Sequence, residues 1–594
     1  MSNRPVPKYG SDFIVDLLKA LGVEYAAFNP GSTFRGIHDS LVNYGGNSGP
    51  EIIECNHEEI AVAIAHGYAK AAGKPMVAMV HDLVGLQHAT MAIYNAWCDR
   101  APVIVMGGTT RDAAKRRAWI DWIHTALSPG NLVRDYVKWD DEPASIEAVP
   151  DAMLRAWKIA LTEPAGPVYL CLDAQIQENE LPQPLPVPDI RLYTSPSKAY
   201  ADPALLEQLA GWLLESSSPV ILADRAVKNR KDMAALTKLA EELAIPVVDK
   251  GSALNFPGNH PLDLSGAASE VIAGADLILA FEVGDLAGAL QKVDIRKRTS
   301  TSVLKKGARV IHISMGDYLT RGWASDYQKL APLDMAISAS AGVALSHLAS
   351  LCGKVLKKAG PTKQREVEKR RQFWGERHDS LREEWKEEAA KQAQCQPIHL
   401  GSLAAAAWDV IKKEDWVLVN GNFGGWARRI WDFTEPGQYL GQSGGAGLGY
   451  GMPASVGAAL AHRGSGKLCV DLQADGDFFF CPQALWTAAH HQIPLLVIMN
   501  NNRSYLNSEN HALSMARERS RPSESRWIGT TIEKPFVDFT GLARSLGIHA
   551  EGPIEKLSDL KPALKRAIKA IKDGNQPALV DVITAKTGRL RDSD

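Results

Sequence analysis

The stretch Leu468-Cys469-Val470-Asp471-Leu472-Gln473-Ala474-Asp475-Gly476-Asp477 begins as an apolar run and ends in a turn of small and acidic residues. A second apolar run, Pro494 to Met499, ends in Asn500-Asn501-Asn502-Arg503-Ser504, and a helix is expected between the two runs. Strand, helix and strand in this order are typical of a β-α-β unit, whose two strands run in the same direction. Asp475 and Asn502 should therefore lie side by side at the carboxyl edge of a parallel sheet, where such folds bind ligands.

The residues of these two turns offer oxygen ligands for a metal ion. Asp475 has a carboxylate, Asn502 has an amide oxygen, and Ser504 follows with a backbone carbonyl. Hard oxygen ligands of this kind suit Mg²⁺, which also accepts oxygens from a bound diphosphate. Two ordinary turns would have a similar composition, so the residue types alone leave a purely structural role open.

The spacing between Asp475 and Asn502, 27 positions, matches the coenzyme motif of thiamine diphosphate enzymes, and the whole chain resembles the acetolactate synthase-like superfamily. The resemblance implies that Asp475, Asn502 and the Ser504 carbonyl hold Mg²⁺ and that Gly476 lies at the coenzyme. The family usually has Gly-Asp-Gly-Ser where this chain has Ala474-Asp475-Gly476-Asp477. We include Asp477 among the expected coenzyme-binding residues, but a carboxylate beside a diphosphate is unfavourable, so its role stays open.

Helical patterns alternate with short apolar runs along most of the chain, which predicts α/β domains whose parallel sheets are covered on both faces. We expect three doubly wound domains in series, at residues 1–188, 189–353 and 397–594, with a charged helical linker at 354–396. The resemblance implies that the first domain binds the pyrimidine of the coenzyme and the last binds its diphosphate. Expected strands lie at 24–28, 51–54, 76–80, 102–106, 219–223, 276–280, 309–313, 416–419, 468–472, 494–499 and 578–583.

Glu58 and Glu59 precede a predicted helix, and helical spacing places their side chains on different stripes. The Glu58 stripe contains small and apolar residues, whereas the Glu59 stripe contains Ala63, His66 and Lys70, so we expect Glu59 on the wetter side. A carboxylate at this position can simply stabilise the start of the helix through its dipole. The resemblance implies instead that Glu58 bonds N1′ of the coenzyme's aminopyrimidine and promotes the imino tautomer that activates the thiazolium ring.

A glycine-rich segment, Gln442 to Ala454, enters a further helix, and glycine permits close backbone approach to a ligand. The resemblance implies that Leu448 wedges the coenzyme into a bent shape and that the Ala446 carbonyl accepts a hydrogen bond from its 4′-amino group. Asn422, at the end of the preceding strand, stands where the family contacts the diphosphate and is a further candidate.

Two segments depart from the family pattern on the substrate side. The loop from Val80 to His88 replaces a Ser-Gly-Pro-Gly loop, so acetolactate synthesis is not assumed. The segment from Trp119 to Thr125 stands near the family's glutamine segment and contains His124. Histidine moves protons near neutral pH, which makes His124 and His81 candidate catalytic residues, although a histidine beside tryptophans is often a packed structural residue.

The composition excludes several classes of protein. The 66 Lys and Arg against 68 Asp and Glu give a net charge of −2, without the basic excess that nucleic-acid binding needs. Seven cysteines without paired spacing argue against a disulfide framework, and no apolar run approaches the ~18 residues of a membrane span. We expect a cytoplasmic protein without a membrane partner. The central domain lacks a glycine-rich phosphate loop, so FAD is not expected there.

Two classes of function remain open: an active thiamine diphosphate-dependent enzyme that makes or breaks carbon–carbon bonds, and a coenzyme-binding structural or regulatory subunit without catalysis. The complete set of Glu58, Asp475 and Asn502 favours the enzyme. We expect it to act on a 2-oxo acid, with decarboxylation and carboligation, and the alternative is a 2-hydroxyacyl-CoA or 2-hydroxyketone lyase. The resemblance implies a homodimer or homotetramer with active sites at the subunit boundary.

Overall fold

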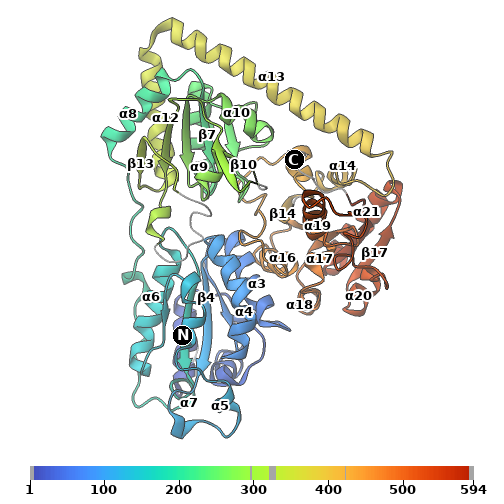
Figure 1. Ribbon diagram of the computed structural model, residues 1–594. Helices are drawn as coiled ribbons and strands as arrows, with labels where there is room; N and C mark the ends of the chain where they lie inside the picture. The colour runs from blue at the N-terminus through green and yellow to red at the C-terminus, as the bar shows by residue number, and fades with distance from the viewer. Residues whose placement is uncertain (1–5, 295–296, 320–329, 422, 587–594) are drawn as a thin grey trace.

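Three α/β domains follow one another along the chain, each built around a parallel sheet (Figure 1). The structure is a computed structural model that describes residues 6–294, 297–319, 330–421 and 423–586. The predicted fold class, doubly wound parallel-sheet domains in series, is confirmed. None of the described helices combines the length and apolar character needed to cross a bilayer.

The N-terminal domain has a six-stranded sheet in the order β2-β1-β3-β4-β6-β5, with all strands parallel. Alternate residues of one strand point to opposite faces, so Val103 and Val105 pack towards α3 and α4 while Ile104 and Met106 pack towards α1 and α6. The elements are β1 (Tyr25–Phe28), β2 (Glu51–Glu54), β3 (Met76–Met79), β4 (Val103–Thr109), β5 (Asp140–Asp141), β6 (Val168–Asp173), α1 (Gly10–Ala20), α2 (Arg35–Asp39), α3 (Glu58–Ala72), α4 (Val84–Cys98), α5 (Ile120–Ile123), α6 (Val149–Leu161) and α7 (Ala174–Glu178).

The central domain has a five-stranded parallel sheet in the order β13-β12-β9-β7-β8, with a separate antiparallel hairpin of β10 and β11. One face packs against α8, α9 and α12, and the other packs against α10 and α11. The elements are β7 (Pro219–Ala223), β8 (Val247–Asp249), β9 (Leu277–Phe281), β10 (Gln291–Asp294), β11 (Thr299–Ser302), β12 (Arg309–Ile313), β13 (Met335–Ile337), α8 (Pro203–Glu215), α9 (Arg230–Leu243), α10 (Ala268–Gly274), α11 (Leu286–Ala289) and α12 (Ala341–Lys358).

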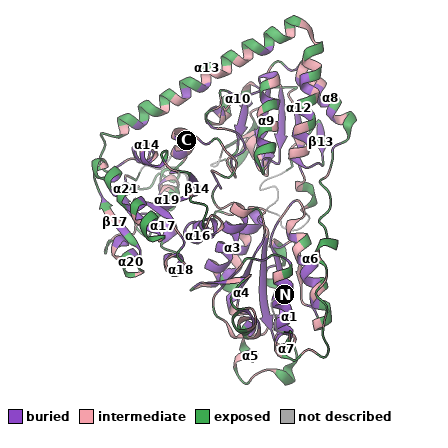
Figure 2. Cartoon of the chain, turned by 180° about the vertical axis from the view of Figure 1, so that it is seen from behind, coloured by how far each residue is buried: buried purple, intermediate pink, exposed green. Residues whose placement is uncertain are grey.

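The charged segment forms α13 (Gly360–Gln392), which runs from the central domain to the C-terminal domain and is largely exposed (Figure 2). Its buried residues Val367 and Leu381 pack into apolar clusters of the central domain, where the Arg370 guanidinium also donates to the carbonyls of Ala244 and Ser217. The preceding helix, α12, runs across position 353, where the sequence suggested a domain boundary.

The C-terminal domain has a five-stranded parallel sheet in the order β14-β15-β16-β18-β17. Strands β15 and β16 are neighbours and parallel, so the turns that follow them lie at one edge. The elements are β14 (Trp416–Asn420), β15 (Leu468–Ala474), β16 (Leu496–Asn501), β17 (His549–Ile554), β18 (Ala578–Ile583), α14 (Leu400–Ile411), α15 (Trp426–Ile430), α16 (Gly451–Ala461), α17 (Asp475–Phe478), α18 (Ala484–His490), α19 (Leu506–Glu518), α20 (Phe539–Ser545) and α21 (Leu557–Gly574).

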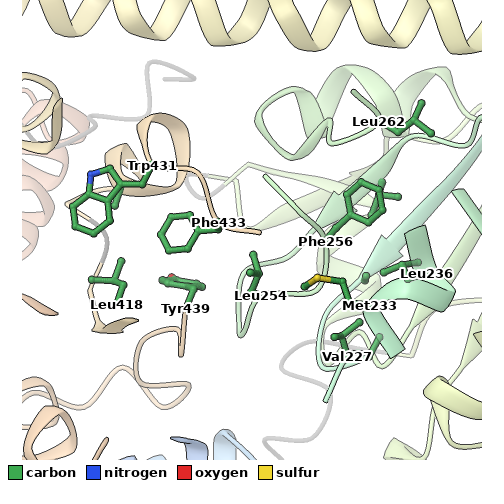
Figure 3. Close-up of a cluster of buried hydrophobic side chains, with 14 of the residues drawn as sticks. Val227, Met233, Leu236, Leu254, Phe256, Leu262, Leu418, Trp431, Phe433 and Tyr439 are labelled. Carbon is green, nitrogen blue, oxygen red and sulfur yellow. The ribbon is translucent and has the colours of Figure 1, made fainter. Parts of the chain in front are cut away.

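An aromatic cluster joins the C-terminal domain to the central domain. Figure 3 shows Trp431, Phe433 and Tyr439 on the C-terminal side, with Leu254 and Phe256 of the central domain beside them. The Trp431 indole N–H donates to the Ala404 carbonyl at 2.9 Å, so this large buried ring has a partner for its polar atom. The two domains therefore share one continuous apolar core.

The N-terminal and C-terminal domains meet where α3 crosses α16. A Cβ atom on Gly67 would lie 1.9 Å from the Ala454 carbonyl oxygen, and one on Gly457 would lie 1.9 Å from the Ile64 carbonyl oxygen. Glycine is required at both positions because the two helix backbones approach each other directly.

We predict that Gly67→Ala destabilises the protein, because the added methyl group forces the helices apart. Overpacking of this kind costs about 1–3 kcal/mol, and thermal unfolding should record a lower midpoint. The matched control is Gly211→Ala in α8, where no atom of the described residues lies within 4 Å of the added Cβ. That change should be neutral or should stabilise the protein by up to about 1 kcal/mol, because alanine favours helix more than glycine does. Equal effects of the two variants would contradict the close-contact explanation.

Candidate active site

Asp475 lies at the carboxyl end of β15, where its side chain is 1% exposed and meets the turn that follows β16. One carboxylate oxygen accepts from the Arg503 backbone N–H at 2.6 Å and the other from the Gly476 N–H at 2.8 Å. Burial raises the pKa of Asp475 to about 7, against the opposing effect of these hydrogen bonds. A cation beside this carboxylate would offset the cost of burying its charge.

Three consecutive asparagines end β16, and their side chains have different partners. The Asn500 oxygen accepts from the Thr584 hydroxyl, and the Asn501 amide donates to Asp581 at 3.0 Å. The Asn502 oxygen accepts from the Ser504 N–H at 2.9 Å, inside the turn that wraps Asp475. The structure thus brings together the three predicted metal ligands, and their carboxylate, amide and carbonyl oxygens fit a hard divalent cation.

Asp477, whose role the sequence left open, turns its carboxylate towards the glycine-rich loop. It accepts from the backbone N–H groups of Gly449 at 2.8 Å and Gly451 at 3.0 Å, and from the Gln473 amide at 2.7 Å. Burial raises the pKa of Asp477, whereas these donors lower it. In this arrangement Asp477 fixes the entry of α16 and therefore the path of the loop that precedes it.

The glycine-rich loop rests on the N-terminal domain of the same chain. The Asn95 side-chain oxygen, on α4, accepts from the Ser443 hydroxyl at 2.6 Å and from the Gly447 N–H at 3.3 Å. Within this loop, Ala446 has a positive φ of 52°, and Leu448 is 42% exposed. The candidate Asn422 lies outside the described residues.

Glu58 begins α3 and is 4% exposed. Its carboxylate lies against Gly85, where an added Cβ would come within 2.4 Å, and its Oε2 lies 3.4 Å from Nδ1 of His88. The His88 ring stacks on the ring of His57 with centroids 4.7 Å apart, and His57 caps the helix by accepting from the Glu59 N–H. Glu58 therefore faces its own domain, towards His81 and the first turns of α4, where His88 lies.

Glu59 is partly exposed, more so than the buried Glu58, as the helical spacing predicted. The face of α3 that carries Glu59 nevertheless packs against the C-terminal domain, because Lys70 donates to the Gln442 carbonyl and to the Tyr450 hydroxyl. A Cβ on Gly449 would lie 2.9 Å from Oε1 of Glu59. Burial, reinforced by the nearby Asp477 carboxylate, raises the pKa of Glu59 to about 7.

His81 and His124 come together beside the glutamate, with ring centroids 4.6 Å apart and ring planes at 84°. Burial lowers the pKa of His81, and His124 lowers it further, while Glu58 opposes this effect. The Nδ1 atom of His124 is buried without a hydrogen-bond partner among the residues that the structure describes. The His81 imidazole thus stands close enough to the Glu58 carboxylate to interact with it electrostatically, and His124 lies next to His81.

The sequence did not identify several residues of this region. Thr33, which bonds His81, and Asn95, which holds the glycine-rich loop, carry no recognisable motif. The segment from Val80 to His88, which the sequence analysis treated as a loop, is helical from Val84 onwards, so His88 lies on α4. Nothing in the sequence of that segment connected His88 to Glu58. The turn Asn29-Pro30-Gly31 before Thr33, directly after the first strand, was the one available signal, since such turns at carboxyl ends often line sites.

A cavity of about 630 Å³ lies where the three domains meet. It borders the carboxyl ends of β7 and β8, and its walls include Lys70, Arg225 and Lys228. The expectation that the central domain carries no flavin stays a prediction.

Comparison with known proteins gives the same three-part division. Family profiles described as the N-terminal TPP binding, central and C-terminal TPP binding domains of thiamine pyrophosphate enzymes match residues 8–127, 206–346 and 420–582. Benzoylformate decarboxylase of Pseudomonas aeruginosa is 27% identical over 548 residues, which is 89% of this chain and 90% of the relative. Chloroplastic acetolactate synthase of Arabidopsis thaliana is 24% identical over 616 residues, 97% of this chain and 81% of the relative.

Solved structures show the same fold. The thiamine diphosphate-dependent 4-hydroxybenzoylformate decarboxylase of Rhodococcus jostii RHA1 matches with a TM-score of 0.75 and 22% identity, over 97% of this chain and 99% of that one. Benzoylformate decarboxylase of Polynucleobacter necessarius matches with a TM-score of 0.75 and 20% identity, over 98% and 99% of the two chains.

The fold and the site together define an enzyme whose chemistry depends on a coenzyme held by an N-terminal and a C-terminal α/β domain. The chain belongs to the thiamine pyrophosphate enzyme family, and the protein is a thiamine diphosphate-dependent enzyme related to benzoylformate decarboxylase and acetolactate synthase.

We predict that Glu59 makes stability depend on pH. Its pKa rises from 4.5 to about 7 on folding, so the folded state keeps a proton that the unfolded chain releases. Stability therefore falls as pH rises through this window, and Glu59→Gln should remove about 1 kcal/mol of that fall after allowance for partial exposure. Thermal unfolding from pH 5 to pH 8 measures the difference from wild type, and Glu387→Gln on the exposed surface of α13 is the control. Parallel curves for wild type and Glu59→Gln would contradict this assignment.

Proposed function

We propose that the protein uses thiamine diphosphate and Mg²⁺ to decarboxylate a 2-oxo acid and to join the remaining acyl carbon to a second carbonyl compound. The observation that carries this proposal is the pair of close imidazoles, His81 and His124, beside the buried Glu58. Loss of CO₂ leaves a carbon or oxygen atom that must take up a proton, and neutral imidazoles suit that step.

The chain's own residues divide the work of holding the coenzyme. The side chains of Asp475 and Asn502 and the Ser504 carbonyl hold Mg²⁺, and through it the diphosphate. Leu448 supports the ring system from the C-terminal domain, and Glu58 holds and shares a proton at the aminopyrimidine. Bound thiamine diphosphate supplies a carbon nucleophile and accepts the electron pair that CO₂ leaves behind.

The substrate side carries the features that distinguish this enzyme from a synthase of acetolactate. His124 moves a proton at the substrate oxygen, and the segment from Val80 to His88, which includes the start of α4, forms the facing wall. Trp119 and Trp122, which are 73% and 56% exposed, offer aromatic surface next to His124. The relative from Pseudomonas aeruginosa is named for an aryl 2-oxo acid, and we propose that a bulky or aromatic 2-oxo acid is preferred over pyruvate.

We further propose that two copies of the chain complete each site. Glu58 faces His81 and the first turns of α4 in its own N-terminal domain, whereas Glu59 faces the C-terminal domain of the same chain. The exposed apolar residues Leu448 and Leu127, the latter fully exposed, are suited to burial by a second copy.

The test of the proposed reaction is mass spectrometry of products from purified enzyme with coenzyme and Mg²⁺, using benzoylformate, pyruvate and a 2-hydroxyacyl-CoA. We expect turnover of benzoylformate above that of pyruvate. Glu58→Gln keeps the shape but lacks the shared proton, so it should lose ~10²–10⁴-fold in rate, while Glu59→Gln should lose little. Cleavage of the 2-hydroxyacyl-CoA alone would favour the lyase, and coenzyme binding without any turnover would favour a silent subunit.

The test of the shared site combines two inactive variants. Asp475→Ala should bind neither Mg²⁺ nor thiamine diphosphate in calorimetry, because the metal links the diphosphate to the protein. Mixing Glu58→Gln and Asp475→Ala chains and allowing subunit exchange should restore part of the activity, since one of the two sites in a mixed dimer is intact. If a fully exchanged mixture stays inactive, each site is completed within one chain.

A further inference from the structure

Thr33 lies directly behind His81, in a short turn that the rest of the domain holds in place. It is 4% exposed, and its backbone carbonyl accepts from the Gln177 amide at 3.0 Å. The same amide donates to the Leu172 carbonyl at 2.9 Å, which ties the turn to the end of β6. The Thr33 hydroxyl is therefore a fixed group rather than a rotating surface one.

The hydroxyl has two polar neighbours. The Asp82 backbone N–H donates to Oγ1 at 3.1 Å, and Oγ1 lies 3.0 Å from Nδ1 of His81. A hydroxyl has one hydrogen to donate, and the Asp82 N–H already occupies one of its acceptor positions. If Nδ1 of His81 also carried a proton, the hydroxyl hydrogen would have no acceptor among the described residues. An unpaired buried donor costs about 1–3 kcal/mol, so the hydroxyl donates to Nδ1.

This direction of donation decides where His81 carries its proton. A neutral imidazole has one N–H, and Nδ1 acts here as the acceptor, so the proton resides on Nε2. The charged and titratable groups that act on His81 are His124, Glu58, Arg117 and Asp121, and with burial their sum favours the neutral ring.

The same turn also anchors the segment that carries the second histidine. The Arg117 guanidinium contacts the carbonyl and the hydroxyl of Ser32 at 3.4 Å and pairs with Asp121 at 2.6 Å. Asp121 lies in α5, which ends next to His124. Two neighbouring residues of one turn thus act on both imidazoles: Thr33 contacts His81 directly, and Ser32 contacts Arg117, which pairs with Asp121 in the helix before His124.

We propose that Thr33 is a positioning residue that fixes His81 in its Nε2–H tautomer, so that His81 presents an N–H donor to an oxygen of the bound substrate. The role of His81 towards substrate rests on the proposed function, whereas the tautomer is a property of the free protein. No bond is made or broken by Thr33 itself. It determines which nitrogen of His81 can donate and which is already occupied.

The first experiment is magic-angle-spinning NMR of the protein with ¹⁵N-labelled histidine, in which a His81→Gln sample assigns the His81 signals. We expect wild-type His81 to be neutral near pH 7 with Nδ1 unprotonated. A wild-type signal from Nδ1–H would overturn the proposal, whatever reaction the enzyme catalyses. This measurement needs no substrate, so its failure is separate from failure of the proposed function.

The second experiment compares Thr33→Val, which lacks the hydroxyl, with Thr33→Ser, which retains it. The matched control is Thr90→Val on α4, where the lost hydroxyl donates to the Leu86 carbonyl of its own helix and also bonds Tyr136. Thr33→Val should lower kcat by ~10–100-fold, in the range found when a supporting hydrogen bond to a functional histidine is lost. KM and coenzyme affinity should change little, and Thr33→Ser and Thr90→Val should stay close to wild type.

The pH profile separates positioning from mere structural support. A donor to Nδ1 stabilises the neutral ring, so its removal raises the pKa of His81 and should move the acid limb of kcat/KM to higher pH. If Thr33→Val loses activity with an unchanged acid limb and an unchanged His81 tautomer, the hydroxyl serves only the fold and the proposal is wrong.

Discussion

The crossing of α3 and α16 is the contact on which the arrangement of the site depends. At Gly67 and Gly457 each helix backbone touches the other, so the crossing can neither slide nor rotate without a clash. One helix turn then assigns two adjacent carboxylates to different environments. Glu59 meets the C-terminal domain of its own chain, and Glu58 is left facing His81 and the start of α4. The register of one helix pair thus determines which glutamate faces the C-terminal domain and which faces the histidines.

Buried carboxylates dominate the electrostatics around this contact. Asp475 and Asp581 at the carboxyl edge of the C-terminal sheet have pKa values raised to about 7 and about 6, and burial is the first cause in both. Burial also raises the pKa of Asp82, beside His81, to about 7. Backbone N–H groups compensate Asp475 and Asp477 only in part, and burying a charge without a partner is costly. The divalent cation that we propose at Asp475 would satisfy that need.

The central domain contributes to the site through packing and not through residues of the motif. Its core continues into the C-terminal domain at Trp431, Phe433 and Tyr439 (Figure 3), and α13 connects the two domains a second time. A shared apolar core restricts relative motion of the domains far more than a polar contact of the same area would. The C-terminal sheet edge is therefore held at a set position above α3.

The sequence by itself determined the features that depend on residues close to one another in the chain. The β-α-β order after Leu468, the meeting of Asp475 with the turn that contains Asn502, and the separation of Glu58 from Glu59 all follow from strand and helix periodicity within a few tens of residues. Short edge strands such as β5, β8 and β13 lack the length for a clear pattern, and the sequence interpretation missed them, as it also missed the longer strands β6 and β17.

Only the tertiary structure decided which distant segments meet. The support of His81 by Thr33, the hold of Asp477 on the entry of α16, and the docking of the Glu59 face each join segments that periodicity treats separately. Strand order in a parallel sheet is set by crossover connections and by burial of both faces. Neither of these can be recognised from the individual residues that the strand order brings together. The chemistry of a single residue can be inferred from the local sequence, whereas its contacts with distant residues depend on the packing of the whole chain.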